Sequence, residues 1–270
     1  MIGLPSDLLW KWWYPVLTRL TRDARVAFLN YGYAGDDKAA EPVLEERDEP
    51  DRPCIQLYDR VAGAIDLQGL RVLEVSCGHG GGASYVARYL GPASVLGIDR
   101  NPRAIELCRA MHRVDGLTFD RGDALALDFA EGAFDVVLNV EASHCYPDVP
   151  RFLGGVQRVL RPGGHLLFAD FRTAGTGAAT LRAQIDASGM DVVQCDDISR
   201  NVVRGMELNS DRSLRLIRDL VPRPLRRAAM RFAGVKGSRI YEALRTGQDV
   251  YLRYVLRKPT ASPAPEGPAR

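Results

Sequence analysis

The feature of this sequence that most limits its fold is a strand pattern that runs directly into a glycine turn. Residues 72–75 read Val-Leu-Glu-Val, and the aliphatic members of this run suit a strand that is covered on both faces. Glycines follow at positions 78, 80, 81 and 82, where the backbone can turn sharply and approach a ligand closely. Apolar residues then recur at helical spacing from Ala83 to Leu90. The pattern predicts a turn between a buried strand and the N-terminus of a helix.

The next apolar run, residues 94–98, ends in Asp99. A carboxylate at the carboxyl end of a second parallel strand is placed to accept hydrogen bonds from both hydroxyls of a ribose. Gly78, Gly80 and Asp99 together therefore predict a nucleoside site. Gly78-x-Gly80-x-x-Ala83 also satisfies the dinucleotide fingerprint, so a dehydrogenase is an alternative. A second alternative is an α/β domain that uses these glycines only to form turns.

Two further acidic residues favour a nucleoside without phosphates. Glu74 stands inside the first predicted strand, where a carboxylate is costly to bury and is usually kept only with a partner. Asp123 follows a third predicted strand at residues 117–119. One acid for the ribose and another for an edge of adenine suit a nucleoside without phosphates better than they suit a dinucleotide with its pyrophosphate.

Two more strands complete the pattern. Residues 134–139 predict a fourth strand, and residues 159–168 predict a helix end, a Pro-Gly turn and a fifth strand. With these motifs, residues 55–175 resemble the class I S-adenosylmethionine-dependent methyltransferases, and the Leu-x-Pro-Gly-Gly turn at 160–164 is the most specific of them. The resemblance implies S-adenosyl-L-methionine as cofactor and a Rossmann-like α/β fold. That fold has a seven-stranded, mostly parallel sheet flanked by helices, an N-terminal helical cap, and an insertion before the last strand.

Three other segments resemble a narrower group within this family. They are residues 12–15, 28–33 and 139–147. Together they are similar to actinobacterial methyltransferases that act on hydroxyls of polyketide lipids, the phthiotriol and phenolphthiotriol dimycocerosate methyltransferases among them, and to sugar O-methyltransferases of antibiotic pathways. The resemblance implies methylation of a hydroxyl of a polyketide-derived lipid, glycolipid or glycosylated natural product. A carbon or nitrogen methyltransferase, or a cyclase that keeps the cofactor as a scaffold, is the alternative, and a protein that binds the cofactor without catalysis is a further one.

The candidate catalytic residues are His144 and Asp170. His144 follows the fourth strand, and its unperturbed pKa near 6.5 suits proton transfer at neutral pH. Asp170 ends the fifth strand, which lies beside the fourth in this fold family. In similar sugar O-methyltransferases a histidine and an aspartate at these places act as a base and its orienting partner, and the resemblance implies the same roles here. Alternatively, His144 only hydrogen-bonds within its loop and Asp170 only caps one.

The expected donor site combines the carboxyl ends of the strands with the N-terminal segment. Its expected members are Tyr31, Tyr33, Glu74, Ser76, Gly78, Gly80, Asp99, Arg100, Asp123, Ala124, Asn139 and Glu141. Tyr31 and Tyr33 either cover the methionine end of the cofactor, as aromatic residues do in similar enzymes, or are merely packed rings. Glu141 either contacts a ligand or satisfies backbone donors at a strand end.

Composition and pattern divide the chain into three regions. Residues 1–54 are expected to form an N-terminal helical cap, with Trp10, Trp13 and Leu17 at helical intervals and an acidic loop from residue 35 to 53. Residues 55–258 are expected to form the catalytic domain, in which residues 176–248 include an insertion over the substrate pocket. Predicted strands lie at 190–195 and 250–256, and the apolar residues from Leu214 to Phe232, with Met206, are expected to roof a hydrophobic pocket. Residues 259–270, rich in Pro and Ala, are expected to be a disordered tail.

The composition also limits the partners. The net charge of +2, from 36 basic and 34 acidic residues, is too small for broad phosphate contact, so no nucleic-acid partner is expected. The expected partner is a hydrophobic small-molecule acceptor, which the apolar residues of the insertion suit. A homodimer is compatible with the sequence. No apolar run approaches the roughly 18 residues of a membrane span, and no signal-peptide core is present, so neither membrane insertion nor export is expected.

The five cysteines are scattered and form no Cys-x-x-Cys pair. This pattern indicates neither a disulfide framework nor a zinc site, and it fits a reducing cytoplasm. No metal is assigned, because no cluster of His, Asp and Glu has the spacing of metal ligands. Some similar sugar methyltransferases use magnesium, and for such an ion Asp170, Asp196 and Asp197 are the only conceivable ligands.

Overall fold

A computed structural model describes residues 26–37 and 41–260. Seven strands form one sheet in the order β3-β2-β1-β4-β5-β7-β6. Neighbouring strands are parallel except at β7, which is antiparallel to both β5 and β6. The strands are β1 Arg71–Val75, β2 Ser94–Asp99, β3 Leu117–Arg121, β4 Phe134–Val140, β5 Leu160–Thr173, β6 Asp191–Asp197 and β7 Asp249–Arg257. The predicted seven-stranded, mostly parallel sheet is confirmed.

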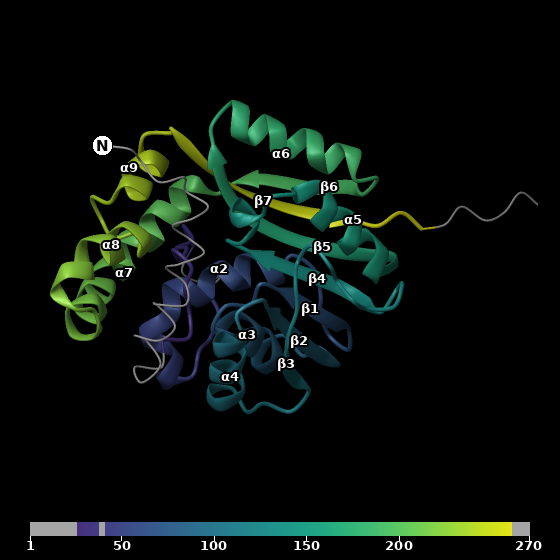
Figure 1. Cartoon of the computed structure of the whole chain (residues 1–270), viewed down its shortest axis with the longest axis horizontal. Helices are drawn as coiled ribbons and strands as arrows, with labels where there is room; N and C mark the ends of the chain where they lie inside the picture. Colours follow the sequence, from purple (N-terminus) through teal and green to yellow (C-terminus); the bar gives the residue numbers. More distant parts are fainter. Residues whose placement is uncertain (1–25, 38–40, 261–270) are drawn as a thin grey trace, which may run out of the picture.

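Helices cover both faces of this sheet (Figure 1). One face carries α2 Arg52–Ala62, α3 Gly81–Tyr89, α4 Pro102–Met111, α7 Ser199–Leu220 and α9 Arg239–Arg245, and the other carries α5 Val149–Val159 and α6 Thr176–Ala187. Successive side chains of a strand point to opposite faces, so Val72 packs in the first core and Leu73 in the second. Burial on both faces explains why the central strands are almost entirely apolar.

The glycine turn after β1 lies tightly against α2. A Cβ on Gly82 would lie 1.9 Å from Cε1 of Tyr58. The Tyr58 hydroxyl donates a hydrogen bond to Oε1 of Glu74 at 2.8 Å, which holds the ring in place. Glu74 is therefore buried together with a hydrogen-bond partner, as its position inside a strand predicted.

The acidic segment from residue 35 to 53 was expected to be a loop, and this is wrong for its second half. A 3₁₀ helix, η2 Glu46–Asp51, leads directly into α2. Pro53 lies in the first turn of α2, where its missing N–H costs nothing, so it favours a helix start and does not break one. The expected boundary between residues 54 and 55 consequently falls inside α2. Trp10, Trp13 and Leu17 of the expected cap, and most of the expected tail, lie outside the described residues.

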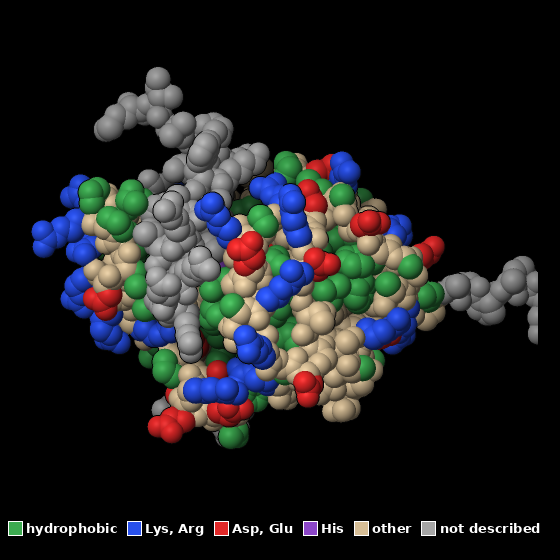
Figure 2. All heavy atoms as spheres, turned by 60° about the horizontal axis from the view of Figure 1, so that its bottom comes forward, with side chains coloured by type: hydrophobic (Ala, Val, Ile, Leu, Met, Phe, Trp, Pro, Cys, Tyr) green, Lys and Arg blue, Asp and Glu red, His purple; other side chains and the backbone are tan. Residues whose placement is uncertain are grey.

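The insertion before β7 contains α7, η4 Arg223–Leu225, α8 Arg226–Phe232 and α9. Ile217, Val221, Ala229 and Val235 pack together as a small core of the insertion itself. Leu214 and Leu225 were expected to help roof a pocket, but they are 39% and 37% exposed, and neither belongs to this core. Figure 2 shows basic side chains gathered at the end of the molecule that α7 and α8 form.

The insertion also holds the N-terminal part of the described chain. A Cβ on Gly205 of α7 would lie 2.4 Å from the backbone nitrogen of Tyr33. Asn201 of the same helix donates from Nδ2 to the carbonyl oxygen of Ala34 at 2.8 Å. Its own backbone carbonyl accepts from the Ala34 N–H at 3.0 Å.

None of the helices in the described ranges is long and apolar enough to span a membrane.

Replacing Gly82 by alanine tests the close packing of the turn. We expect Gly82→Ala to lower the free energy of unfolding by about 1–3 kcal/mol, because the added methyl group overlaps the Tyr58 ring. The matched control is Gly154→Ala, in α5, where a Cβ meets nothing within 4 Å. That change should raise the free energy of unfolding by about 0.5–1 kcal/mol, because alanine favours a helix. Urea unfolding followed by circular dichroism measures both; equal effects of the two changes would contradict the packing argument.

Candidate active site

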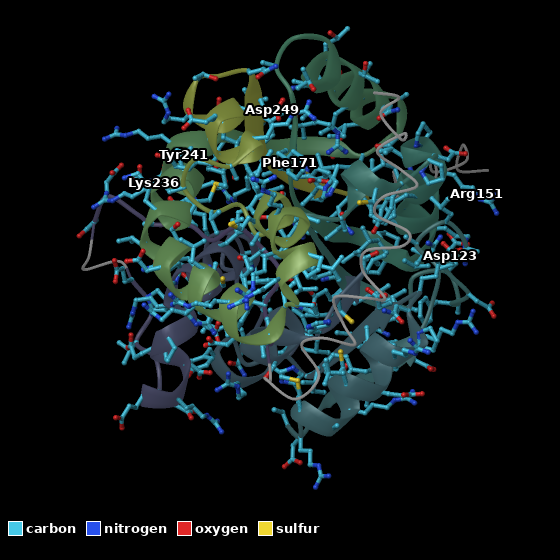
Figure 3. All side chains as sticks on the ribbon, turned by 60° about the vertical axis from the view of Figure 1, so that its left-hand side comes forward. Asp123, Arg151, Phe171, Lys236, Tyr241 and Asp249 are labelled. Carbon is cyan, nitrogen blue, oxygen red and sulfur yellow. The ribbon has the colours of Figure 1, made fainter. Side chains whose placement is uncertain are left out.

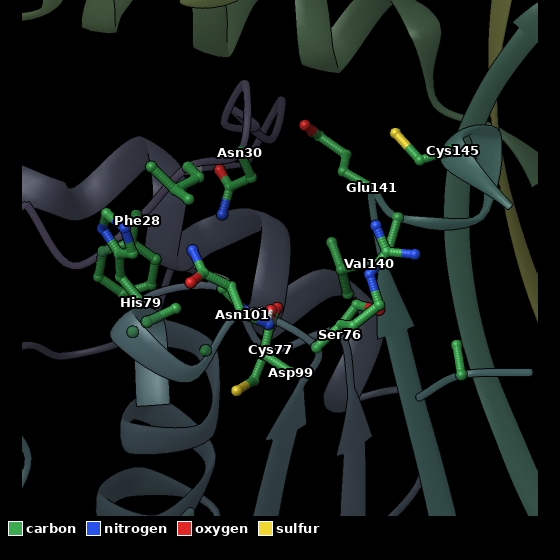
Figure 4. A pocket seen from close by; sticks show the side chains of 18 of the residues that line it. Phe28, Asn30, Ser76, Cys77, His79, Asp99, Asn101, Val140, Glu141 and Cys145 are labelled. Atoms are coloured by element: carbon green, nitrogen blue, oxygen red, sulfur yellow. Dashed lines mark hydrogen bonds between the residues drawn. The ribbon is translucent and has the colours of Figure 1, made fainter. Parts of the chain in front are cut away.

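A cavity of about 430 Å³ opens at the carboxyl ends of β1, β2 and β4 (Figure 4). One side is formed by residues 27–30, and the others by the glycine turn and by the loops after β2, β3 and β4. Seven of the predicted donor residues line it: Ser76, Gly78, Asp99, Arg100, Asp123, Ala124 and Glu141. Segments far apart in the sequence thus meet at one edge of the sheet, as parallel strand topology requires.

The other predicted donor residues lie outside this lining. Gly80 is the N-cap of α3, and Glu74 is buried beneath the turn with Tyr58. Asn139 is also buried, and its Nδ2 donates to the Val75 carbonyl and to the Tyr146 hydroxyl, both at 2.9 Å. These three residues support the wall from behind. Tyr31 and Tyr33 are not in the lining either, although residues 27–30 just before them are.

Asp99 is fixed by the backbone on both of its oxygens. Oδ2 accepts a hydrogen bond from the Gly78 N–H at 3.0 Å, and Oδ1 accepts one from the Asn101 N–H at 2.8 Å. Burial raises the pKa of Asp99, and these two N–H groups oppose the rise. A carboxylate has about four acceptor positions. Asp99 therefore keeps acceptor capacity on each oxygen in the cavity wall.

Glu141 links the end of β4 to the N-terminal segment. Its Oε1 accepts from the Tyr31 N–H and from the Tyr251 hydroxyl, both at 3.0 Å. Burial raises the pKa of Glu141 to about 8. The Tyr31 ring packs on the partly buried Phe171 of β5, labelled in Figure 3, at 5.7 Å between ring centroids. Glu141 thus accepts a hydrogen bond from the backbone of a distant segment. It also lines the cavity, where a ligand could contact it.

His144 and Asp170 meet, as predicted. His144 lies in η3 Ser143–Cys145, directly after β4, and its Nδ1 lies 2.8 Å from Oδ1 of Asp170. The other oxygen of Asp170 accepts from the Ser143 hydroxyl at 2.6 Å and from the His144 N–H at 2.8 Å. The His144 ring packs on Phe171 at 4.4 Å between centroids. The imidazole is therefore held by both a carboxylate and an aromatic ring.

Arg172 is a member of this cluster that sequence reasoning missed. Its Nη1 lies 3.1 Å from Oδ2 of Asp170, and its Nη2 donates to the Ser143 hydroxyl at 2.6 Å. Burial alone would raise the pKa of Asp170, but His144 and Arg172 hold it below its usual value. Burial alone would lower the pKa of His144, and Asp170 outweighs it, so the pKa of His144 is raised. The alternation of β5, which places Arg172 two residues after Asp170, was the available signal.

His144 does not line the donor cavity among the described residues, although its neighbours Ala142 and Cys145 do. It lies instead along a second groove of about 370 Å³, with Arg172 and residues of α6 such as Thr180. Tyr146 lines both hollows. Sequence reasoning also missed the contributions of Phe28, Asn30, Tyr58, Asn101, Cys145 and Tyr146 to the donor cavity. Phe28, Asn30, Cys145 and Tyr146 lie within the segments 28–33 and 139–147, which the resemblance had singled out without giving these residues a role in the donor site.

The three carboxylates considered as metal ligands do not come together. Asp196 pairs with Arg60 at 3.1 Å and with Arg253, which is buried. Asp170 is committed to His144 and Arg172, and Asp197 accepts from the backbone of Ser199. The part of the chain that the structure describes contains no group of side chains that could hold a metal ion.

Comparison with known proteins shows which family this chain resembles. A family model for a methyltransferase domain matches residues 66–211. The phthiotriol/phenolphthiotriol dimycocerosates methyltransferase of Mycobacterium leprae is 44% identical over 250 residues, which cover 93% of this chain and 92% of that protein. The fatty-acid O-methyltransferase of Mycolicibacterium smegmatis is 44% identical over 246 residues, which cover 91% and 88% of the two chains.

Solved structures share the fold at lower identity. The [4+2]-cyclase SpnF superposes with a TM-score of 0.71 at 19% identity and covers 97% of this chain and 98% of its own. A geranyl diphosphate C-methyltransferase from Streptomyces coelicolor, solved with S-adenosyl-L-homocysteine, superposes with a TM-score of 0.64 at 15% identity and covers 95% and 98%. Because the family model matches residues 66–211 and a curated relative that is 44% identical covers 93% of the chain, the chain belongs to the S-adenosylmethionine-dependent methyltransferase family.

Proposed function

We propose that this enzyme methylates a hydroxyl oxygen of a polyketide-derived lipid, glycolipid or glycosylated natural product. The observation that carries the proposal is the His144–Asp170 pair, joined at 2.8 Å beside the wall of the donor cavity. A hydroxyl must lose its proton as its oxygen is methylated, and an imidazole held by a buried carboxylate suits this task. Relatives named for phthiotriol and phenolphthiotriol dimycocerosates, 44–46% identical, support the acceptor class.

The donor cavity fits S-adenosylmethionine on its own residues. Asp99, with acceptor capacity left on both oxygens, would bind the ribose hydroxyls, and Asp123, which lines the cavity after β3, would bind an edge of the adenine. The backbone of the glycine turn at Gly78 would lie against the methionine portion. When bound, the cofactor supplies a methyl group on a positively charged sulfur, which an oxygen nucleophile can attack.

The residues of this chain would then align the acceptor and accept its proton. Asp170 holds the proton of His144 at Nδ1, so the other ring nitrogen is the one that accepts. Glu141 holds Tyr31 and thereby keeps residues 27–30 over the cavity, where they exclude water from the reacting atoms.

A carboxylate acceptor is the second candidate, and the raised pKa of His144 favours it. The fatty-acid O-methyltransferase relative is 44% identical over 91% of this chain. A carboxylate needs no base, since it is already ionised at neutral pH. His144, with its pKa raised by Asp170, would then act as a cation that binds the acceptor beside Arg172.

Replacing Asp99 tests the binding of the methyl donor. Asp99→Ala should weaken binding of S-adenosylmethionine by about tenfold or more, because each lost hydrogen bond from a ribose hydroxyl to the carboxylate contributes about 1.5–3 kcal/mol. The control is Asp186→Ala, an exposed residue of α6 that pairs only with Arg182 in the described contacts. Titration calorimetry measures both. Equal affinity of the Asp99 variant and the wild type would contradict the assignment of the ribose.

The second prediction concerns His144. His144→Ala should lower kcat toward phthiotriol dimycocerosate by about 10²–10⁴-fold, the usual contribution of a general base. Its affinity for S-adenosylmethionine should stay within twofold of wild type, because His144 is not in the lining of the donor cavity. His165→Gln is the control, since His165 lies five residues before Asp170 on β5 and pairs with Val136, near the amino end of β4. Unchanged turnover of the His144 variant would remove the base from the mechanism.

The pH profile separates the two acceptors. A base must be neutral, so the rate toward a hydroxyl should rise with pH through the raised pKa of His144. A cation that binds a carboxylate must be protonated, so the rate toward hexadecanoate should fall with pH through the same pKa. Asp170→Asn removes the charge that raises this pKa and should move either midpoint to lower pH. A profile with no such limb, in the wild type, would argue against both roles.

A further inference from the structure

The end of the insertion where α7 meets α8 carries a local excess of positive charge. Residues 212–236 contain eight basic residues and one acidic residue, Asp219, whereas the whole chain is nearly balanced, with 36 and 34. The fold brings basic side chains together at this end of the molecule, as Figure 2 shows. A concentrated cationic surface on a protein with almost no net charge indicates an anionic partner at that place.

Two of these arginines have structural partners. Arg212 pairs with Asp51 at 2.7 Å, which joins α7 to the end of η2. Arg226 donates from Nη2 to the carbonyl oxygen of Arg218 at 2.6 Å and from Nε to that of Val221 at 2.9 Å. It thereby satisfies carbonyl groups at the C-terminal end of α7. Packing of the insertion therefore accounts for Arg212 and Arg226.

Four other arginines of this segment have no such role. They lie on the last turns of α7, in η4 and at the start of α8, and they are exposed: Arg215, Arg218, Arg223 and Arg227. Within the residues that the structure describes, their side chains form no salt bridge and no hydrogen bond. We call residues 215–227 the basic tip. Because the folded chain leaves these four charges unpaired, they are available to a partner.

Apolar side chains are interleaved with these cations. Leu225 is 37% exposed and stands between Arg223 and Arg227, and Leu214, directly before the basic tip, is 39% exposed. Leu208, earlier on α7, is 64% exposed. Three of the five large apolar side chains that are exposed in the described part of the chain thus belong to the insertion. Exposed leucines beside unpaired arginines are typical of an interaction surface.

We propose that the basic tip docks on the surface of a bilayer that contains anionic lipids. The interfacial region of such a bilayer attracts arginines through its anionic headgroups and takes up apolar side chains at the boundary with the acyl chains. A nucleic-acid backbone would attract the arginines but would gain nothing from Leu214 and Leu225. The leucines therefore favour the bilayer as the partner.

The same insertion packs against the segment that covers the donor cavity. Gly234, which follows α8, has a φ of 61°, and a Cβ there would lie 2.6 Å from Cδ1 of Tyr31. Residues 27–30, just before Tyr31, form one side of the cavity. For a lipid acceptor, which stays in the bilayer, docking would bring this side of the enzyme to its substrate. That consequence rests on the proposed function, whereas the docking itself does not.

Vesicle sedimentation tests the docking without any acceptor. The full-length chain is mixed with vesicles of phosphatidylcholine alone or of phosphatidylcholine and phosphatidylglycerol in a ratio of about 7:3. We expect the mixed vesicles to bind the chain about tenfold or more tightly than the neutral ones, and about 0.5 M sodium chloride to release most of it. A chain that binds neither kind of vesicle, or both equally, overturns the proposal.

Replacing the arginines separates a local surface from general charge. One variant carries three changes in the basic tip, Arg218→Ser, Arg223→Ser and Arg227→Ser, and should bind the mixed vesicles about tenfold or more weakly than wild type. The control loses the same charge at exposed positions outside the tip and should bind within about twofold of wild type; its changes are Arg113→Ser, Arg151→Ser and Arg200→Ser. Both should bind S-adenosylhomocysteine as the wild type does, which shows that they are folded. Equal losses of vesicle binding in the two variants overturn the proposal.

Replacing one leucine distinguishes a bilayer from a nucleic acid. Leu225→Ser should weaken binding to the mixed vesicles about three- to tenfold, because this apolar side chain no longer enters the interface. Val43→Ser is the matched control, since Val43 is 91% exposed outside the basic tip, and it should bind as the wild type does. Vesicle binding that Leu225→Ser leaves unchanged overturns the proposal. Binding of a single-stranded RNA that the arginine variant of the tip loses would then assign the surface to a nucleic acid.

Turnover tests whether docking serves the proposed reaction. With phthiotriol dimycocerosate in the mixed vesicles, the arginine variant of the tip should raise KM about tenfold and leave kcat unchanged, because the chemical step is not altered. In uncharged detergent micelles its KM should equal that of the wild type. If the wild type does not methylate this lipid in either form, the proposed function is wrong, and the vesicle experiments still decide the docking. If it does and the variant has an unchanged KM in vesicles, docking does not deliver the acceptor.

Discussion

The buried carboxylate of Asp170 is the interaction on which the arrangement of this active site depends. It has no exposed surface, so its charge must be compensated from within the protein. Ser143, His144, Phe171 and Arg172 all direct hydrogen-bond donors or cations at it. Because three of the groups that bind it come from the loop after β4 and the others from β5, one carboxylate fixes the loop against the sheet. Removing it would leave the imidazole and the guanidinium close together without a counter-charge.

Backbone strain is concentrated at the same edge of the sheet. Among the described residues other than glycine, only Ser76 and Glu141 have positive φ, at 61° and 49°. Both follow the end of a central strand and both line the donor cavity. Their side chains offset the strain, Ser76 through a 2.6 Å hydrogen bond with the Tyr146 hydroxyl and Glu141 through Tyr31 and Tyr251. Strain that is retained at a ligand site is typical of positions where the backbone is held in a functional conformation.

Much of the fold and part of the site could be predicted because the responsible signals are local. The strand and glycine turn around Gly78, and the acid at Asp99, depend on residues close in the sequence. The pairing of His144 with Asp170 required in addition only the neighbouring positions of β4 and β5, which the family pattern implies. Local signals were misleading where Pro53 was taken for part of a loop, because a proline in the first turn of a helix and one in a loop look alike without the capping geometry.

The sequence by itself determined the order of strands and helices, the nucleoside-type turn and the residue types available at the ends of the strands, because hydrophobic period, glycine and acid placement are properties of short segments. Only the tertiary structure decided which side of η3 each residue faces, so that Cys145 meets the donor cavity while His144 lies behind it. It also decided that Glu141 holds Tyr31, 110 positions away, and that Arg172 shares Asp170. These choices depend on how distant segments pack, and side-chain direction in a short irregular loop has no period from which it could be read. The glycine turn therefore indicates the kind of ligand, while packing around Asp170 brings Ser143, His144 and Arg172 together.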